Sequence, residues 1–190
     1  MSLELTIVLL LILLNGFFAL SEMAVMTARK TRLRQRAGDS RGARIALELA
    51  EKPERFLSSV QVWITLIGIL TGFFGGESIA MALRDELALI PWIARHAQPV
   101  SVGISVGIIL FVSVVVGELV PKRLAIVRPE KIATAVAIPM RILATAAAPA
   151  VSLLSVTTEA LFRLFPVKHG NDSDVTEEEI KMLVAESHEQ

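Results

Sequence analysis

The stretch VVVGELVPKRLAI, residues 114–126, places a glutamate at the end of a long apolar run and a proline three residues later. The uncharged residues 99–117 before Glu118 are sufficient for a helix that crosses a bilayer core, which takes about 20 residues. Proline has no N–H, and its ring clashes with the carbonyl four residues earlier. Pro121 therefore predicts a break in the helix and a Gly117 carbonyl without its usual donor. That carbonyl and the Glu118 carboxylate together suit a bound cation.

The composition indicates a membrane protein. The 190 residues are 53% hydrophobic and carry no net charge, and their mean hydropathy of +0.60 is too high for an ordinary soluble domain of this size. The chain has no cysteine, which excludes disulfides and thiolate metal sites and leaves oxygen ligands for any bound metal. A net charge of zero also gives no electrostatic basis for binding nucleic acid.

Three segments are predicted to cross the membrane: residues 3–26, 56–76 and 99–120. Lys and Arg are concentrated in the connection between the first two segments and again just after the third, whereas residues 77–98 contain few of them. Basic residues are retained on the cytoplasmic side of a membrane. We therefore expect a multi-pass protein of the plasma (inner) membrane, with its N-terminus outside and its C-terminal end in the cytoplasm.

Two further segments are predicted to be helical. Residues 29–52 have partly helical apolar spacing on either side of the turn GDS (38–40), and Pro53 is expected to end the second helix. The arginines of this segment favour a helical hairpin on the cytoplasmic surface. Residues 132–165 are long enough for a fourth span, but on composition alone a re-entrant segment and an interfacial helix are equally open. The residues that interrupt this segment are Pro139, Arg141, Pro149 and Glu159.

Each predicted span carries oxygen-bearing groups on a limited face. Polar groups are costly at membrane depth and by default mark a site or a pathway. Oxygen ligands from three helices would suit a hard divalent cation such as Mg²⁺. The candidates are Asn15, Ser21 and Glu22 in the first span, Ser58, Ser59, Gln61 and Thr65 in the second, and Gly117 and Glu118 in the third.

Simpler roles are also open for these residues. Serines in membrane helices usually bond a neighbouring backbone carbonyl. Glu118 can pair with Lys122, four residues further along the same helix, and Glu22 can pair with Arg29 or Lys30 near the interface. The glycine and proline beside Glu118 favour a functional role for this acid, whereas both interpretations of Glu22 stay open.

Three stretches together resemble one known family. The transmembrane domain of the CorC and cyclin M family has three similar stretches in the same order: LNGFFALSEMAVMTARKTRLRQRAGDSRGARIALELAEKPERFLSSVQVWITL (14–66), VVGELVPKRLAI (115–126) and TEEEIKMLV (176–184). The resemblance covers about residues 5–190. It implies a homodimer in which residues 1–165 form an ion-transport domain, with three spans and a belt of juxtamembrane helices at about 29–52 and 129–165. It also implies that residues 166–190 begin a cytoplasmic linker to a pair of CBS modules that this chain lacks, and that ATP binds only to those modules.

The resemblance implies a function and a site. Members of the family are implicated in Mg²⁺ export, thought to be coupled to Na⁺. Their site is similar here to Ser21, Ser59, Gly117 and Glu118, with Pro121 and Lys122 as structural residues beside it. The chain departs from the family where WIT (63–65) replaces a stretch that contains Asn, so the ligands from the second span stay open.

These observations favour a Mg²⁺ transporter that works by alternating access. A Mg²⁺ sensor that regulates other transporters needs the same selective site, so the sequence leaves this alternative open. An enzyme is not expected, because the chain has no GxSxG or HExxH motif and its histidines lie outside the predicted spans. A pore is disfavoured because no ring of filter residues is present.

Overall fold

The computed structural model describes residues 2–164, and the expected linker at 166–190 lies outside them. All regular structure in the described part is helical, which confirms the expected all-α class. The long helices are α1 (Ser2–Thr27), α4 (Pro53–Leu87), α5 (Ala97–Val114) and α7 (Pro129–Leu164). The short elements are α2 (Lys30–Arg36), α3 (Arg41–Glu51), the 3₁₀ turn η1 (Ala94–His96), the π-helical turn η2 (Val115–Leu119) and α6 (Val120–Val127).

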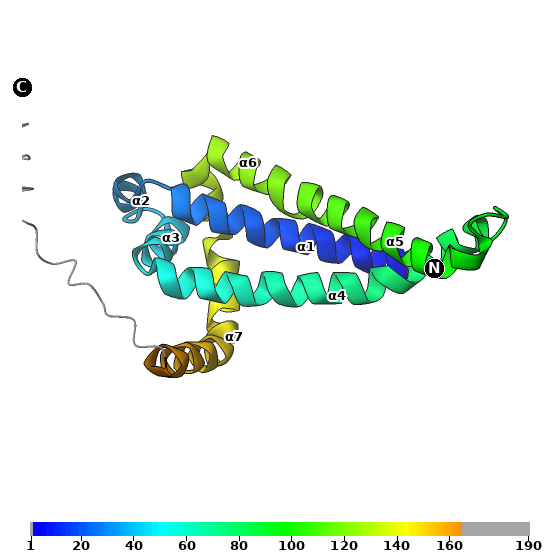
Figure 1. Cartoon of the computed structure of the whole chain (residues 1–190). Coiled ribbons are helices and arrows are strands. Elements are labelled where there is room, and N and C mark those ends of the chain that lie inside the picture. The colour runs from blue at the N-terminus through cyan, green and yellow to red at the C-terminus, as the bar shows by residue number, and fades with distance from the viewer. Residues whose placement is uncertain (1, 165–190) are drawn as a thin grey trace, which may run out of the picture. The chain divides into compact units, whose positions relative to one another are not determined.

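Three long helices lie side by side and carry the candidate site (Figure 1). α4 runs antiparallel to α1, while α5, η2 and α6 follow one another along a line parallel to α1. The ring of Phe18 on α1 stacks on Trp63 of α4, with centroids 6.0 Å apart. Val25 and Val60 are buried in the same core. The apolar runs of the sequence thus pack against one another on one side and leave their other sides open.

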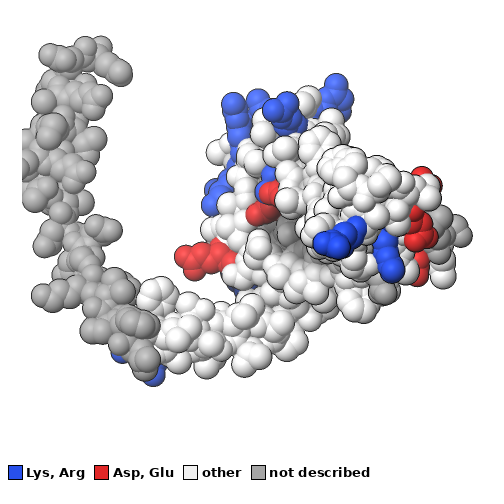
Figure 2. Space-filling view, turned by 45° about the vertical axis from the view of Figure 1, so that its right-hand side comes forward, with Lys and Arg blue, Asp and Glu red and all other residues white. Residues whose placement is uncertain are grey.

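Four helical segments of the described chain are long and apolar enough to cross a membrane: Leu3–Thr27, Pro53–Leu87, Ala94–Val127 and Pro129–Arg163. Their outward side chains are large and apolar, as a lipid-facing surface requires; Leu10, Ile69, Phe73 and Phe111 are examples. Figure 2 shows broad uncharged surface, with charged side chains gathered in separate groups. The chain is therefore a multi-pass membrane protein, and the count of three spans stays a prediction.

The prediction that the helix breaks at Pro121 is wrong. The chain remains helical across this residue, because α5 widens into η2 and continues as α6. In η2 the N–H of Val120 bonds to the carbonyl of Val115, five residues earlier. A π-helical turn carries one extra residue, so it moves the carbonyl of Gly117 away from the proline nitrogen, which has no hydrogen to donate. Such turns occur frequently at functional sites.

The connection between α1 and α4 folds into two short helices. The hydroxyl of Ser40 caps α3 by accepting a bond from the N–H of Ala43, at 3.3 Å. α3 ends at Glu51, directly before Lys52 and Pro53, as the sequence predicts. Pro53 also begins α4, where a missing N–H has no cost. α4 also extends well beyond the predicted span 56–76, through Arg84 to Leu87.

The first part of α7, residues 129–152, passes behind α1 and α4 in Figure 1 and crosses them instead of running alongside. The indole N–H of Trp63 donates to the carbonyl of Leu143 at 3.0 Å. Arg141 pairs with Glu48 of α3 at 3.1 Å. This part of the helix is therefore held to both α3 and α4. Residues 153–164 continue the helix and belong to a second compact unit.

Candidate cation site

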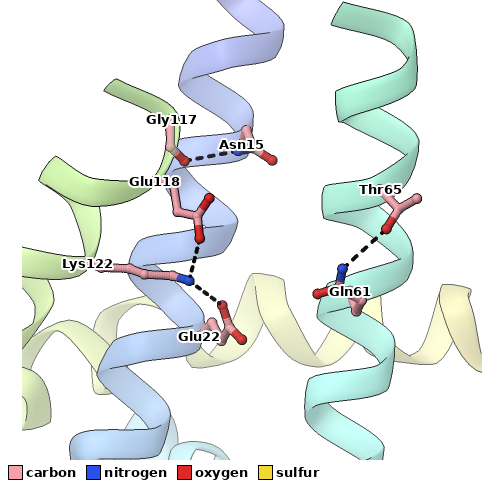
Figure 3. A network of polar contacts seen from close by, with 7 residues as sticks. All are labelled: Asn15, Glu22, Gln61, Thr65, Gly117, Glu118 and Lys122. Carbon is pink, nitrogen blue, oxygen red and sulfur yellow. Dashed lines mark hydrogen bonds and ion pairs between the residues drawn. The ribbon is translucent and has the colours of Figure 1, made fainter. Parts of the chain in front are cut away.

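The carbonyl of Gly117 accepts a hydrogen bond from another helix. The side-chain amide of Asn15 on α1 donates to it at 3.0 Å (Figure 3). The two backbones approach closely here, because a Cβ added to Gly117 would lie 3.2 Å from Asn15 Nδ2 and 3.3 Å from the carbonyl of Ile12. Glycine therefore permits the contact between α1 and η2, and the carbonyl of Gly117 has a donor in a side chain of another helix.

The carboxylates of Glu118 and Glu22 share one ammonium group. Lys122 Nζ lies 2.9 Å from Glu118 Oε1 and 3.6 Å from Glu22 Oε2 (Figure 3). The first contact is the pairing that we considered as an alternative to a cation site. The second links α6 to α1, and it differs from the expected pairing of Glu22 with Arg29 or Lys30. The two acids thus lie beside a cation that belongs to the chain itself.

Ser21 and Ser59 are buried at similar heights on facing helices. Ser21 follows Phe18 by three residues and Ser59 precedes Trp63 by four, and these two rings stack. Because α1 and α4 are antiparallel, both serines lie about 5 Å beyond the rings on the same side, from a rise of about 1.5 Å per residue. Each hydroxyl donates within its own helix, from Ser21 to Phe17 at 2.7 Å and from Ser59 to Arg55 at 2.8 Å.

The other polar residues of α4 lie apart from Glu118. Gln61 Nε2 donates to Thr65 Oγ1 at 3.4 Å, and both side chains are exposed, as is Ser58. In Figure 3 this pair lies on α4, separate from the group formed by Asn15, Glu22, Gly117, Glu118 and Lys122. Ser59 also lines a groove of about 460 Å³ between α3, α4 and α7. The structure therefore joins Asn15 and Glu22 to Gly117 and Glu118. It leaves Ser21 and the candidates from the second span outside this group.

Two buried polar atoms in the described residues have no hydrogen-bond partner: Asn15 Oδ1 and Ser113 Oγ. Buried polar atoms are normally satisfied, so each requires an explanation. An unpartnered amide oxygen is a ligand that Mg²⁺ and Na⁺ accept. Asn15 therefore provides a bond to the Gly117 carbonyl through its nitrogen and an open acceptor through its oxygen. Among residues 2–164, no three Asp, Glu or His side chains converge to form a metal site.

Comparison with known proteins identifies the family. The family described as the cyclin M transmembrane N-terminal domain matches residues 6–190. The chain belongs to this family. The resemblance that we found in the sequence is confirmed, and Glu118, Pro121 and Lys122 lie inside the matched cyclin M domain.

Relatives of this cyclin M domain occur in several bacteria. The UPF0053 protein sll0260 of Synechocystis sp. is 48% identical over 184 residues, which are 96% of this chain and 41% of the relative. The UPF0053 protein YhdT of Bacillus subtilis is 33% identical over 93% of this chain and 39% of its own length. The polyamine export protein of Haemophilus influenzae is 29% identical over 92% of this chain and 40% of its own length. The chain thus spans about two fifths of the length of each of these three relatives.

Sequence patterns missed two features of this site. The bond from Asn15 to Gly117 and the pair between Glu22 and Lys122 join residues about a hundred positions apart, and no spacing rule reaches that far. The π-helical turn did leave a signal. Pro121 lies four residues after Gly117 inside a run that is otherwise helical, which requires either a break or one extra residue in the turn.

Proposed function

We propose that the chain is the membrane part of a cation exporter that carries Mg²⁺, with Na⁺ as the coupling ion, and that works by alternating access. The observation that carries this proposal is the group of oxygen atoms around η2. The carboxylate of Glu118, the carbonyl of Gly117 and the open Oδ1 of Asn15 come from two helices that contact each other at that turn. Mg²⁺ takes about six oxygen ligands at roughly 2.1 Å and keeps some of its own water.

In this proposal the negative charge of Glu118 contributes most of the free energy of Mg²⁺ binding. Its side chain is 46% exposed, so the rest of the chain does not enclose it. Neutral oxygens alone do not compensate for removing water from a divalent cation. Ser21 and Ser59 would contribute neutral hydroxyl ligands if their helices moved toward η2. Gln61, Thr65 and Ser58 would line the pathway that the ion follows.

Two alternative functions would use the same site. A Mg²⁺ sensor would bind the ion without moving it. A polyamine exporter is favoured by the name of the Haemophilus relative and by the two carboxylates, since a polyamine carries separated ammonium groups like that of Lys122. We also propose a homodimer in the inner membrane, because exposed polar side chains such as Gln61 would be satisfied by a second copy.

The test is flux in proteoliposomes that contain a Mg²⁺ dye. Glu118→Gln keeps the shape of the side chain and removes its charge, and we expect it to reduce Mg²⁺ flux to background. Glu48→Gln is the matched control, because it removes an acid from an ion pair of similar length on α3. Binding without flux in the unaltered chain would favour the sensor. Spermidine flux that Glu118→Gln abolishes, without Mg²⁺ flux, would favour the polyamine exporter.

A further inference from the structure

Lys122 places a positive charge where the proposed cargo would bind. Its ammonium lies between the acids of α1 and η2, 2.9 Å from Glu118 and 3.6 Å from Glu22. Figure 3 shows the ammonium pointing toward both carboxylates. The carboxylate of Glu118 is therefore already paired when an ion approaches it. The ammonium of Lys122 cannot diffuse away, because it is a side chain of α6.

We infer that Lys122 is a tethered competitor of the cargo: it binds the Glu118 carboxylate when no ion is present and moves to Glu22 when a divalent cation arrives. This inference rests on the proposed function. It makes Lys122 a positioning and specificity-determining residue, and it makes Glu22 the acceptor of the displaced ammonium and not a ligand of the ion.

The geometry favours this exchange. Lys122 is already within ion-pair distance of Glu22, so the ammonium has to move by less than the length of one bond to complete that pair. The lysine side chain is long and flexible, and its ammonium carries three donors that can rotate from one carboxylate to the other. Glu118 is also the more exposed of the two acids, at 46% against 23% for Glu22. Glu118 is therefore the less enclosed acid for an incoming ion, and Glu22 is the one left to the ammonium.

The charges predict selectivity. The two carboxylates and the ammonium sum to −1, so the group attracts cations even with Lys122 in place. A monovalent ion has the same charge as the ammonium and gains little by displacing it. A divalent ion interacts about twice as strongly with Glu118 at the same distance, so it can displace the ammonium. Lys122 would thus discriminate against monovalent ions at this carboxylate.

Equilibrium binding of MgCl₂ tests the inference, measured by calorimetry on the chain in lipid nanodiscs. Lys122→Met removes the competitor and should tighten Mg²⁺ binding by about fivefold or more, the range of ordinary coupling between sites. Glu22→Gln removes the second acceptor, keeps the ammonium on Glu118 and should weaken binding by a similar factor. In the Lys122→Met background, Glu22→Gln should weaken binding by a smaller factor than in the unaltered chain, because no ammonium is left for Glu22 to accept. Arg141→Met, which breaks a surface ion pair with Glu48, is the control and should not change the affinity.

Each result decides the matter. Unchanged or weaker binding by Lys122→Met, and by Lys122→Gln as a second variant, would show an ion pair that only holds α1 to α6. If Glu22→Gln weakens binding by the same factor with and without Lys122, Glu22 does not act by accepting the ammonium. Either result overturns the inference and leaves the proposed function intact. An unaltered chain that binds no Mg²⁺ would overturn the proposed function itself, and the inference with it.

Discussion

The side-chain amide of Asn15 donates a hydrogen bond of 3.0 Å to the carbonyl of Gly117, 102 residues further along the chain. This bond joins α1 to the one turn of the described chain that is π-helical. Pro121 cannot donate to that carbonyl because it has no N–H, whereas Asn15 donates to it from another helix. One side chain thus connects the packing of two helices to the oxygen atoms of the candidate site.

Asn15→Leu should therefore reduce stability and Mg²⁺ binding together. It removes the donor to Gly117 and the open Oδ1, and one such interhelical bond contributes about 1 kcal/mol in membrane proteins. Thermal unfolding in detergent and calorimetry with MgCl₂ would measure the two effects. Thr27→Val is the control, because it removes an exposed bond within α1 to the carbonyl of Met23. Normal Mg²⁺ affinity in Asn15→Leu would exclude this side chain as a ligand.

Pro121→Ala should weaken transport by restoring ordinary helix. The new N–H at position 121 can donate to Gly117, so the π-helical turn is no longer required and the carbonyl is engaged within its own helix. We expect Mg²⁺ flux in proteoliposomes to fall several-fold while expression and assembly are retained. Pro129→Ala is the matched control, since Pro129 begins α7, where no helical donor is needed. Equal Mg²⁺ flux in both variants would show that transport does not need the π-helical turn.

Long apolar runs made the helices predictable, whereas contacts between helices were not. Residues 3–26 had to be helical because an apolar segment in lipid must satisfy its own backbone. The end of α4 was missed because Arg84 and its acidic neighbours mark the edge of an apolar run without ending a helix. The partner of Glu22 was missed for a different reason. It depends on how far α6 is shifted along α1, and local spacing does not reveal contacts between these helices such as the close approach of Gly16 to Pro121.

Gly42→Ala should loosen the contact between α3 and α7. A Cβ at Gly42 would collide with the backbone carbonyl of Thr134, which cannot move as a side chain can. Overpacking of this kind costs about 1–3 kcal/mol. Gly38→Ala is the control, because a Cβ there meets nothing within 4 Å, and its effect should stay within about 0.5 kcal/mol. Thermal unfolding of both variants in detergent would compare them, and equal midpoints would contradict the close contact.

The number of spans can be counted with single cysteines, since the chain has none of its own. Cysteine is placed at Ser2, at Asp39 in the turn between α2 and α3, and at Ser173 near the C-terminal end. Three spans with α7 on the cytoplasmic side predict that a membrane-impermeant maleimide labels only the Ser2 variant in intact cells and labels the other two after lysis.

The concentration of Lys and Arg near Asp39 and after Glu118 favours this outcome, because basic segments are retained inside. The ion pair of 3.6 Å between Arg32 and Glu130 agrees with it, since it joins the first connection to the start of α7 at one end of the helices. If α7 crosses the bilayer as a fourth span, the Ser173 variant will label from outside together with Ser2, and the Asp39 variant alone will be protected. Labelling of Asp39 in intact cells would reverse the whole orientation.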